Sequence, residues 1–174
     1  MLEKYVSKGS KKLRCGFTTG TCAAAASAGA ARMLLSGKVI ENITVITPSG
    51  NSVTVGLTDI KKENDYVSCA VQKDSGDDPD VTDKILVYST VSYEKSGITV
   101  DGGEGVGRVT KKGLKQQIGE AAINPVPRKM IEEQLKTAAS DYSYDGGLKA
   151  VISVPMGIQI AKKTFNPRLG IEGG

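Results

Sequence analysis

The sequence contains no histidine and no tryptophan, and aromatic residues make up only 5% of its 174 positions. Without histidine the chain has no His-based triad, no His-ligated zinc and no His general base. Acid–base chemistry therefore falls to Asp, Glu, Lys, Tyr or Cys. The shortage of aromatic rings also disfavours a nucleic-acid-binding surface built from base-stacking platforms. These absences exclude several common function classes before any motif is considered.

Long apolar runs are missing as well. No stretch approaches the ~18 apolar residues that a membrane helix needs, and the N-terminal segment lacks the apolar core of a signal peptide. The three cysteines, Cys15, Cys22 and Cys69, match no metal-binding spacing, which indicates reduced thiols and no protein-held metal. These features predict a cytoplasmic protein without a membrane partner.

What the chain does contain is ordinary for a globular protein. Its length allows one sizeable domain, or at most two small ones. The 23 Lys and Arg residues against 19 Asp and Glu residues give a net charge of +4, which permits an acidic ligand without requiring one. The basic run from Lys8 to Arg14 raises the alternative of a nucleic-acid-binding domain. No recognition helix or aromatic-rich strand pair supports it, so a solvated N-terminal arm is the simpler interpretation and no nucleic acid is expected.

Two helices are predicted from the apolar pattern. The Ala-rich run indicates a helix over 22–36, with Thr19 or Thr21 as its N-cap and Gly37 just past its end. A second helix is predicted over 127–139, with Pro127 at its first position. A further short helix is expected over 157–163.

Period-two alternation predicts the strands. A hairpin is expected from 43–47 and 53–57, and further strands are expected over 66–72, 85–92, 98–100 and 147–155, with a polar link at 59–65. The expected fold is α+β, a two-layer sandwich in which helices cover a mainly antiparallel sheet. Residues 1–145 are expected to form an N-terminal α+β domain. Residues 146–174 are expected to begin a second α/β domain, which the abrupt Gly173-Gly174 end suggests is truncated.

Five glycines stand in the fourteen residues from Asp101 to Leu114, here called the glycine loop (residues 101–114). Dense glycines let a backbone turn with positive φ and press its N–H groups against an anion or a nucleotide-like cofactor. A surface turn is an equal alternative on this stretch alone. The Rossmann interpretation fails, because no helix follows the glycines directly and the preceding strands form hairpins.

Two polar stretches are further candidates for a site. Residues 15–21, here called the threonine segment, combine three threonines and two glycines at a helix start, which suits an anion. Residues 73–84, here called the acidic loop, carry four aspartates within seven positions. The spacing of a calcium-binding EF-hand is absent. A solvated turn is favoured over a carboxylate cluster, which would raise one pKa by like-charge repulsion and so supply a general base.

The chain resembles the cobalt-precorrin-5B C1-methyltransferase family of anaerobic cobalamin biosynthesis. Five motifs in family order carry the resemblance: Leu13-Arg-Cys-Gly-Phe-Thr-Thr-Gly-Thr-Cys, Asp74-Ser-Gly-Asp-Asp-Pro-Asp-Val-Thr, Gly103-Glu-Gly-Val-Gly-Arg-Val-Thr, Gly119-Glu-Ala-Ala-Ile-Asn-Pro-Val-Pro-Arg and Phe165-Asn-Pro-Arg-Leu-Gly-Ile. Family members continue past the length of this chain, so the resemblance covers their N-terminal part.

The resemblance implies methyl transfer from S-adenosylmethionine to C1 of a cobalt-containing tetrapyrrole, with cobalt present only in the substrate. The candidate general bases are Asp77, Asp78 and Asp80. The candidate donor-binding residues are Gly103, Glu104, Gly105, Val106, Gly107 and Thr110. The candidate substrate-binding residues are Arg14, Thr18, Thr19, Gly20, Thr21, Asn124 and Arg128. The alternative is a truncated module that binds the tetrapyrrole but has no donor site, and a homo-oligomer is compatible with the sequence.

Overall fold

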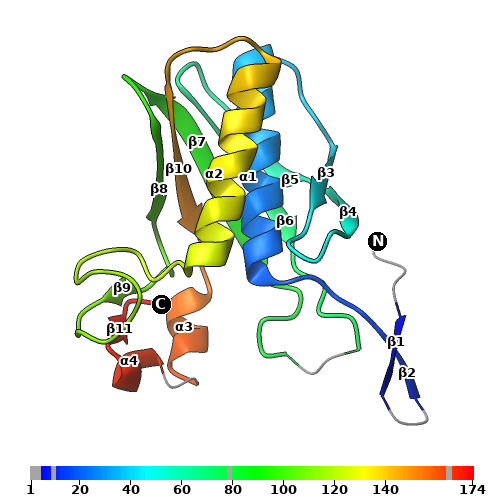
Figure 1. The fold of residues 1–174 in the computed structure, drawn as a ribbon, viewed down its shortest axis with the longest axis vertical. Coiled ribbons are helices and arrows are strands. Elements are labelled where there is room, and N and C mark those ends of the chain that lie inside the picture. Colours follow the sequence, from blue (N-terminus) through cyan, green and yellow to red (C-terminus); the bar gives the residue numbers. More distant parts are fainter. Residues whose placement is uncertain (1–4, 9–10, 78–79, 164–165) are drawn as a thin grey trace.

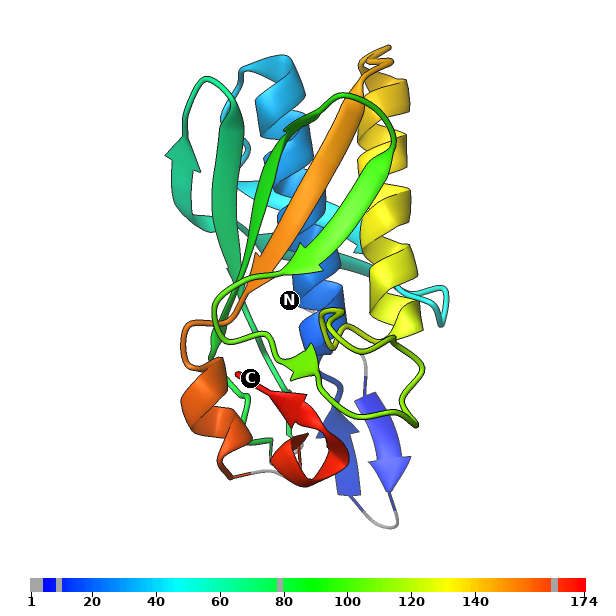
Figure 2. The same ribbon diagram turned by 90° about the vertical axis from the view of Figure 1, so that its left-hand side faces the viewer.

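Two long helices lie side by side on one face of a five-stranded sheet (Figures 1 and 2). The computed structural model describes all residues except 1–4, 9–10, 78–79 and 164–165. The helices are α1 (Thr19–Ser36) and α2 (Pro125–Asp141). This arrangement confirms the expected two-layer α+β class, and it brings the first turns of both helices to the same end of the molecule (Figure 1). Within the described residues, no helix is both long and apolar enough to span a membrane.

The sheet is antiparallel apart from one parallel pair. Its strands, in spatial order, are β5 (Thr58–Lys62), β6 (Tyr66–Gln72), β7 (Leu86–Glu94), β10 (Gly147–Ser153) and β8 (Ile98–Gly102). The parallel pair is β10 with β8, and α2 lies in the connection between them. A parallel pair needs such a long crossover, which explains why α2 lies against the sheet.

The remaining elements lie around this core. The strands β3 (Asn42–Ile46) and β4 (Ser52–Gly56) form the expected hairpin. Three further short strand and helix groups complete the described chain: β1 (Tyr5–Lys8) with β2 (Lys11–Arg14), β9 (Arg108–Val109) with β11 (Ile171–Glu172), and the helices α3 (Gly157–Ala161) and α4 (Asn166–Leu169).

Helix α1 forms the centre of the core because its side chains are small. All residues from Thr21 to Ala31 are buried, and most of them are alanine. Small side chains let the helix backbone approach both the sheet and α2. Ser27 on α1 and Ser89 on β7 are fully buried and share a hydrogen bond of 2.8 Å. This bond satisfies both hydroxyls where the helix crosses the sheet.

The ends of the helices correct part of the sequence analysis. The N-cap of α1 is Thr18, whose hydroxyl accepts a hydrogen bond from the Thr21 N–H, and not Thr19 or Thr21. Gly37 ends the helix as expected, with a φ of 72°. Helix α2 begins at Pro125, two residues before the expected start, because both prolines fit its first turn, where no N–H donor is needed.

Several segments with weak patterns were also predicted wrongly. The arm from Lys8 to Arg14 contributes to a strand pair, and the polar link 59–65 contains most of β5. The strand β10 lies between β7 and β8, so residues after 145 supply an interior strand to the same sheet as those before it. A boundary at 145/146 therefore does not separate two sheets, and the start of a second domain in 146–174 stays a prediction.

Candidate functional site

The threonine segment and the acidic loop are packed directly against each other at the start of α1. Cys15 forms an isolated antiparallel bridge with Gly76, and the Phe17 N–H donates to the Asp74 carbonyl at 2.9 Å. The Arg14 guanidinium binds Asp74 through two hydrogen bonds of 2.6 and 2.8 Å. Arg14 holds the pKa of Asp74 well below its usual range. These contacts join two segments that lie far apart in the sequence into one surface at the start of α1.

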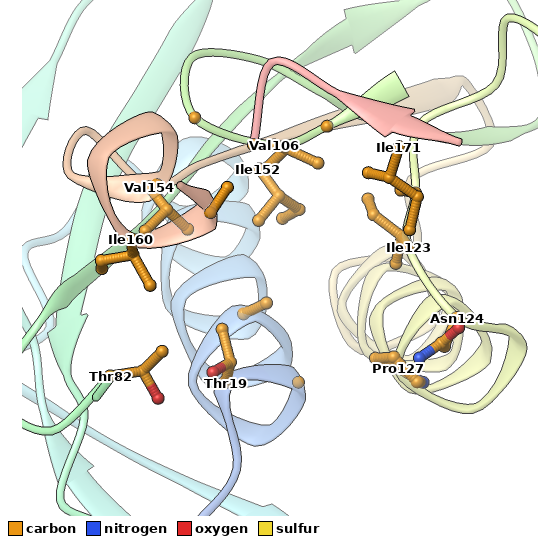
Figure 3. A pocket seen from close by; sticks show the side chains of 18 of the residues that line it. Thr19, Thr82, Val106, Ile123, Asn124, Pro127, Ile152, Val154, Ile160 and Ile171 are labelled. Carbon is orange, nitrogen blue, oxygen red and sulfur yellow. The ribbon is translucent and has the colours of Figure 1, made fainter. Parts of the chain in front are cut away.

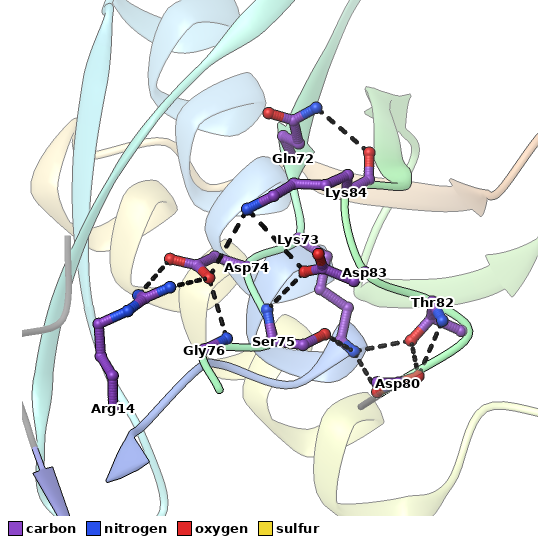
Figure 4. A network of polar contacts seen from close by, with 10 residues as sticks. All are labelled: Arg14, Gln72, Lys73, Asp74, Ser75, Gly76, Asp80, Thr82, Asp83 and Lys84. Atoms are coloured by element: carbon purple, nitrogen blue, oxygen red, sulfur yellow. Dashed lines mark hydrogen bonds and ion pairs between the residues drawn. The ribbon is translucent and has the colours of Figure 1, made fainter. Parts of the chain in front are cut away.

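The acidic loop contains a buried lysine at its base (Figure 4). Lys73 is 3% exposed, and its ammonium group donates to Ser75 at 2.9 Å, to Thr82 at 2.7 Å and to the Asp80 carboxylate. These three bonds use all three N–H donors of the ammonium group. The loop is therefore folded around a buried cation, which corrects the simple solvated turn.

The Lys73 contact also corrects the expected electrostatics of the carboxylates. The hydrogen bond from Lys73, followed by that from Thr82, lowers the pKa of Asp80 to about 2. The predicted rise of a pKa by like-charge repulsion is therefore wrong at Asp80. Asp77 accepts a 2.7 Å hydrogen bond from the Arg14 N–H. Asp78 lies outside the described residues.

An apolar cavity of about 360 Å³ opens between the first turns of α1 and α2, the glycine loop and α3 (Figure 3). No charged side chain of the described chain lines it. Its lining consists of Thr19, Gly20, Ala23, Thr82, Ile85, Gly105, Val106, Gly107, Ala122, Ile123, Asn124, Pro127, Ile131, Ile152, Val154, Gly157, Ile160, Ala161, Ile171 and Gly174.

Three glycines of the glycine loop, Gly103, Gly105 and Gly107, face protein atoms and not the cavity with their Cβ-free sides, whereas no atom lies within 4 Å of that side at Gly113. A Cβ at Gly103 would lie 2.5 Å from Ser153 Oγ, one at Gly105 would lie 1.7 Å from the Val154 carbonyl oxygen, and one at Gly107 would lie 2.4 Å from Ile171. Close packing of the loop therefore accounts for these glycines. Gly105, Val106 and Gly107 still form part of the cavity wall, whereas Gly103, Glu104 and Thr110 do not.

A larger and more polar cavity of about 760 Å³ lies beside the first. Hydroxyl and amide side chains dominate its polar wall, and Lys73 and Asp80 are its charged members. Its lining consists of Cys15, Gly16, Phe17, Thr18, Thr19, Gly20, Thr21, Thr47, Pro48, Ser49, Asn51, Val53, Lys73, Asp80, Asn124, Val126, Pro127 and Met130. The whole predicted set Thr18–Thr21 is therefore brought together here with Asn124 and Asp80.

The two cavities adjoin along a boundary made of Thr19, Gly20, Asn124 and Pro127, which line both of them. A Cβ at Gly20 would lie 2.7 Å from the Pro127 Cβ, so glycine is what lets the first turns of α1 and α2 meet. Lys73 lines the polar cavity, and its bonding partner Thr82 lines the apolar one. The acidic loop thus reaches both cavities.

The two predicted arginines lie outside these walls. Arg14 is engaged with Asp74, and Arg128 donates to the Val100 carbonyl at 2.6 Å and to the Ala121 carbonyl at 3.4 Å. Their contacts hold backbone segments together. A substrate-binding role for Arg14 or Arg128 stays a prediction.

The sequence analysis missed Lys73, Thr82 and the apolar wall. A single lysine beside four aspartates was a usable signal, because a cation next to a carboxylate cluster forms ion pairs. The apolar wall had no such signal. Ile152, Ile160 and Ile171 come from separate elements, and only the folded chain brings them to one cavity.

Comparison with known proteins agrees with this architecture. The CbiD family model matches residues 6–174. A cobalt-precorrin-5B C(1)-methyltransferase of Ruminiclostridium cellulolyticum is 51% identical over 99% of this chain and 45% of its own length. One of Geobacillus kaustophilus is 53% identical over 94% of this chain and 44% of its own.

A solved structure is similar as well. The 1.9 Å crystal structure of a cobalamin biosynthesis protein from Archaeoglobus fulgidus has a TM-score of 0.71 and 36% sequence identity. The likeness covers 98% of this chain and 54% of that one. The chain spans about half the length of the relatives it matches. The matched residues include nearly the whole chain, and it belongs to the CbiD family.

Proposed function

We propose that the protein is an S-adenosylmethionine-dependent methyltransferase that methylates C1 of cobalt-precorrin-5B, giving cobalt-precorrin-6A in cobalamin biosynthesis. The curated relatives named for this activity are about 50% identical over nearly all of this chain. The activity belongs to proteins about twice as long. The assignment to this chain therefore rests on its own cavities.

The observation that carries the proposal is the pair of adjoining cavities at the meeting point of the threonine segment, the acidic loop and the glycine loop. Methyl transfer between two bound molecules requires the reacting atoms to be held close together and in line. Two cavities that share Thr19, Gly20, Asn124 and Pro127 in their walls offer two neighbouring compartments. This arrangement suits a two-substrate reaction better than a single binding pocket would.

The methyl donor fits the residues around the apolar cavity. S-adenosylmethionine supplies a methyl group whose bond to sulfur breaks as a carbon–carbon bond forms, which leaves S-adenosylhomocysteine. The cavity volume falls within the range of small-ligand sites. Backbone groups of Gly105–Gly107 and the hydroxyl of Thr19 would orient the donor, and the apolar wall would exclude water.

The tetrapyrrole substrate carries peripheral carboxylates. Hydroxyls at the first turn of α1, the Asn124 amide and the positive end of the α1 dipole would bind them. Since Thr18 and Thr21 already share a capping hydrogen bond of 3.1 Å, Thr19 and Asn124 are the more available partners. The macrocycle carbon is the nucleophile, so these residues act chiefly by alignment.

Proton transfer is assigned to the acidic loop. Asp77, Asp78 and Asp80 are the candidate bases, and Asp80 is ionised over the working range because its pKa is lowered to about 2. A carboxylate with so low a pKa accepts protons weakly, which weakens the assignment of Asp80 as the base. Full retention of methyl transfer in Asp77→Asn, Asp78→Asn and Asp80→Asn would remove the loop from the chemistry.

The second candidate function is a tetrapyrrole-binding module without a donor site. It is favoured by the shared length of only about 45% of the R. cellulolyticum relative, because donor-binding residues can lie in the remaining part of such relatives. We expect either form to act in the cytoplasm, and a homo-oligomer is compatible with both functions.

The test is a methyl-transfer assay. The 174-residue chain is incubated with cobalt-precorrin-5B and methyl-labelled S-adenosylmethionine, and labelled tetrapyrrole is detected by mass spectrometry. Labelled product with the methyl group at C1 is the expected result. Tetrapyrrole binding without any labelled product would favour the binding module, and absence of both would overturn the proposal for this chain.

A further inference from the structure

We infer that the two cavities are separate chambers for the two reactants: the apolar cavity takes the methyl donor and the polar cavity takes the polycarboxylate tetrapyrrole. The inference rests on the proposed function and adds to it a site for each reactant. It also makes the boundary Thr19, Gly20, Asn124 and Pro127 the place where the reacting atoms meet.

The sizes of the cavities favour the donor in the apolar cavity and the tetrapyrrole in the polar cavity over the opposite assignment. The polar cavity, at about 760 Å³, has about twice the volume of the apolar one, at about 360 Å³. A tetrapyrrole with its side chains has more than twice as many non-hydrogen atoms as S-adenosylmethionine. The larger reactant therefore matches the larger chamber.

Charge favours the same distribution. None of the described residues that line the apolar cavity is charged, so no cationic side chain there would repel the donor's sulfonium. The polar cavity contains Lys73 and Asp80, whose charges offset each other in an ion pair. The first turn of α1 directs partial positive charge into the same region. Carboxylates are therefore better accommodated there than a sulfonium.

The boundary itself explains why the first turns carry Gly20 and Pro127. Their contact lets the first turns of α1 and α2 meet, with no side chain from Gly20 between the chambers. A thicker boundary would separate the reacting atoms beyond the near-contact distance that transfer requires. The threonine segment and the Asn124-Pro-Val-Pro motif thus contribute to both chambers at once.

Variants that alter one chamber test the assignment. Ile160 on α3 is partly buried in the wall of the apolar cavity, and Ile160→Trp would fill it. Ile158, on the same helix, is 46% exposed and lines neither described cavity, so Ile158→Trp is the matched control. Val126 on α2 is 58% exposed and lines only the polar cavity. Val126→Glu adds repulsion toward carboxylates there, and Val126→Lys is its charge-reversed partner.

Binding is measured directly, without turnover. S-adenosylhomocysteine is titrated by calorimetry, and cobalt uroporphyrin, a flat cobalt tetrapyrrole with peripheral carboxylates, is titrated by the change in its visible absorption. Each variant is first compared with the wild type by circular dichroism. We expect Ile160→Trp to raise the Kd for S-adenosylhomocysteine by about tenfold or more and to leave the tetrapyrrole Kd within about twofold.

The polar-chamber variants are expected to behave in the opposite way. Val126→Glu should raise the tetrapyrrole Kd several-fold, Val126→Lys should not, and neither should change S-adenosylhomocysteine binding. Ile160→Trp weakening the tetrapyrrole instead, or both ligands weakening together in every variant, would overturn the two-chamber assignment. So would failure of either ligand to bind the folded wild type. The methyl-transfer assay on the wild type reports on the proposed function independently of these results.

Discussion

Arg14 and Asp74, 60 positions apart in the sequence, form an ion pair through two parallel hydrogen bonds of 2.6 and 2.8 Å. The paired groups are both partly buried, with side-chain exposures of 23% and 19%. Bidentate pairs of this kind fix direction as well as distance. The pair therefore sets the position of the acidic loop relative to the threonine segment, and with it the rim of the polar cavity.

Acid should weaken the ion pair between Arg14 and Asp74. Because the folded-state pKa of Asp74 lies well below its usual range, its stabilising contribution is complete above the unfolded value of about 3.9. It is lost as the pH falls below that value toward the folded pKa. Asp74→Asn should lower the free energy of unfolding at pH 7, and the deficit should shrink below pH ~4. Urea unfolding at a series of pH values measures this.

The exposed Asp145 supplies the control for that series. Asp145→Asn should change the free energy of unfolding by less than about 0.5 kcal/mol at every pH, as expected for a surface substitution. A deficit for Asp74→Asn that stays constant from pH 7 to pH 3 would show that the ion pair does not supply the stabilisation.

Removal of the buried Lys73 ammonium group should lower the free energy of unfolding. Lys73→Met takes a cation away from Asp80, Thr82 and Ser75, and we expect a loss of about 1–3 kcal/mol in the free energy of unfolding. The partial exposure of Asp80, 38% at its side chain, lets water replace part of the contact. The pKa of Asp80 should also rise from its folded value of about 2, since the Lys73 hydrogen bond is the first cause of its low value.

Lys84→Met is the matched control for Lys73→Met. Lys84 lies in the same loop, 3.8 Å from Asp74, but its side chain is 62% exposed. A change within about 0.5 kcal/mol is expected there. Equal losses at the two positions would mean that loop charge in general, and not the buried ammonium group, stabilises the acidic loop.

Replacement of two glycines with similar backbone angles, Gly105 and Gly50, should lower stability to different extents. Gly105 and Gly50 have φ values of 70° and 79°, so Ala at either position costs about 1–2 kcal/mol for the left-handed conformation. Only Gly105→Ala also places its Cβ 1.7 Å from a carbonyl oxygen, whereas no atom lies within 4 Å at Gly50. Gly105→Ala should therefore cost more than about 4 kcal/mol. Thermal unfolding measures the melting temperatures of Gly105→Ala and Gly50→Ala. Similar melting temperatures would contradict the close packing of the loop at Gly105.

The two buried cysteines should not react in the folded protein. Burial raises the pKa of Cys22 and of Cys69 to about 12, so little thiolate exists at pH 8. Iodoacetamide labelling followed by peptide mapping should find both unmodified until denaturant is added. The pKa of these thiols in the unfolded chain is about 8.5. Their ionisation should therefore leave the free energy of unfolding unchanged below about pH 8.5 and lower it as the pH rises from there toward 12. Labelling of Cys22 or Cys69 in the native protein at pH 8 would contradict their burial.

The elements that could be predicted from the sequence are those with strong local patterns. The strand over 66–72 coincides with β6, and the hairpin at 43–57 and the Gly37 helix end were also placed correctly. Local alternation and a single left-handed glycine specify such features without help from the rest of the chain. By contrast, β5 consists largely of polar residues and becomes a strand because it pairs with β6.

The site was predictable in part for the same reason. Thr18–Thr21 and Asn124 lie in motifs with dense glycine, threonine or proline, and the structure brings them to one cavity. The glycine loop was interpreted as ligand-facing, but Gly105 is required by its close approach to Val154 and α3, and Gly107 by its close approach to β11, and no local pattern reveals these contacts. Lys73 was overlooked because its role depends on burial, which only the folded loop provides.

The most direct test of the donor site is a calorimetric titration of the 174-residue chain with S-adenosylhomocysteine. We expect one site per chain with a micromolar Kd, in the apolar cavity beside Gly105–Gly107. Absence of binding by a chain that circular dichroism shows to be folded would contradict this expectation. The donor site would then lie outside this chain, which would be left as a tetrapyrrole-binding module.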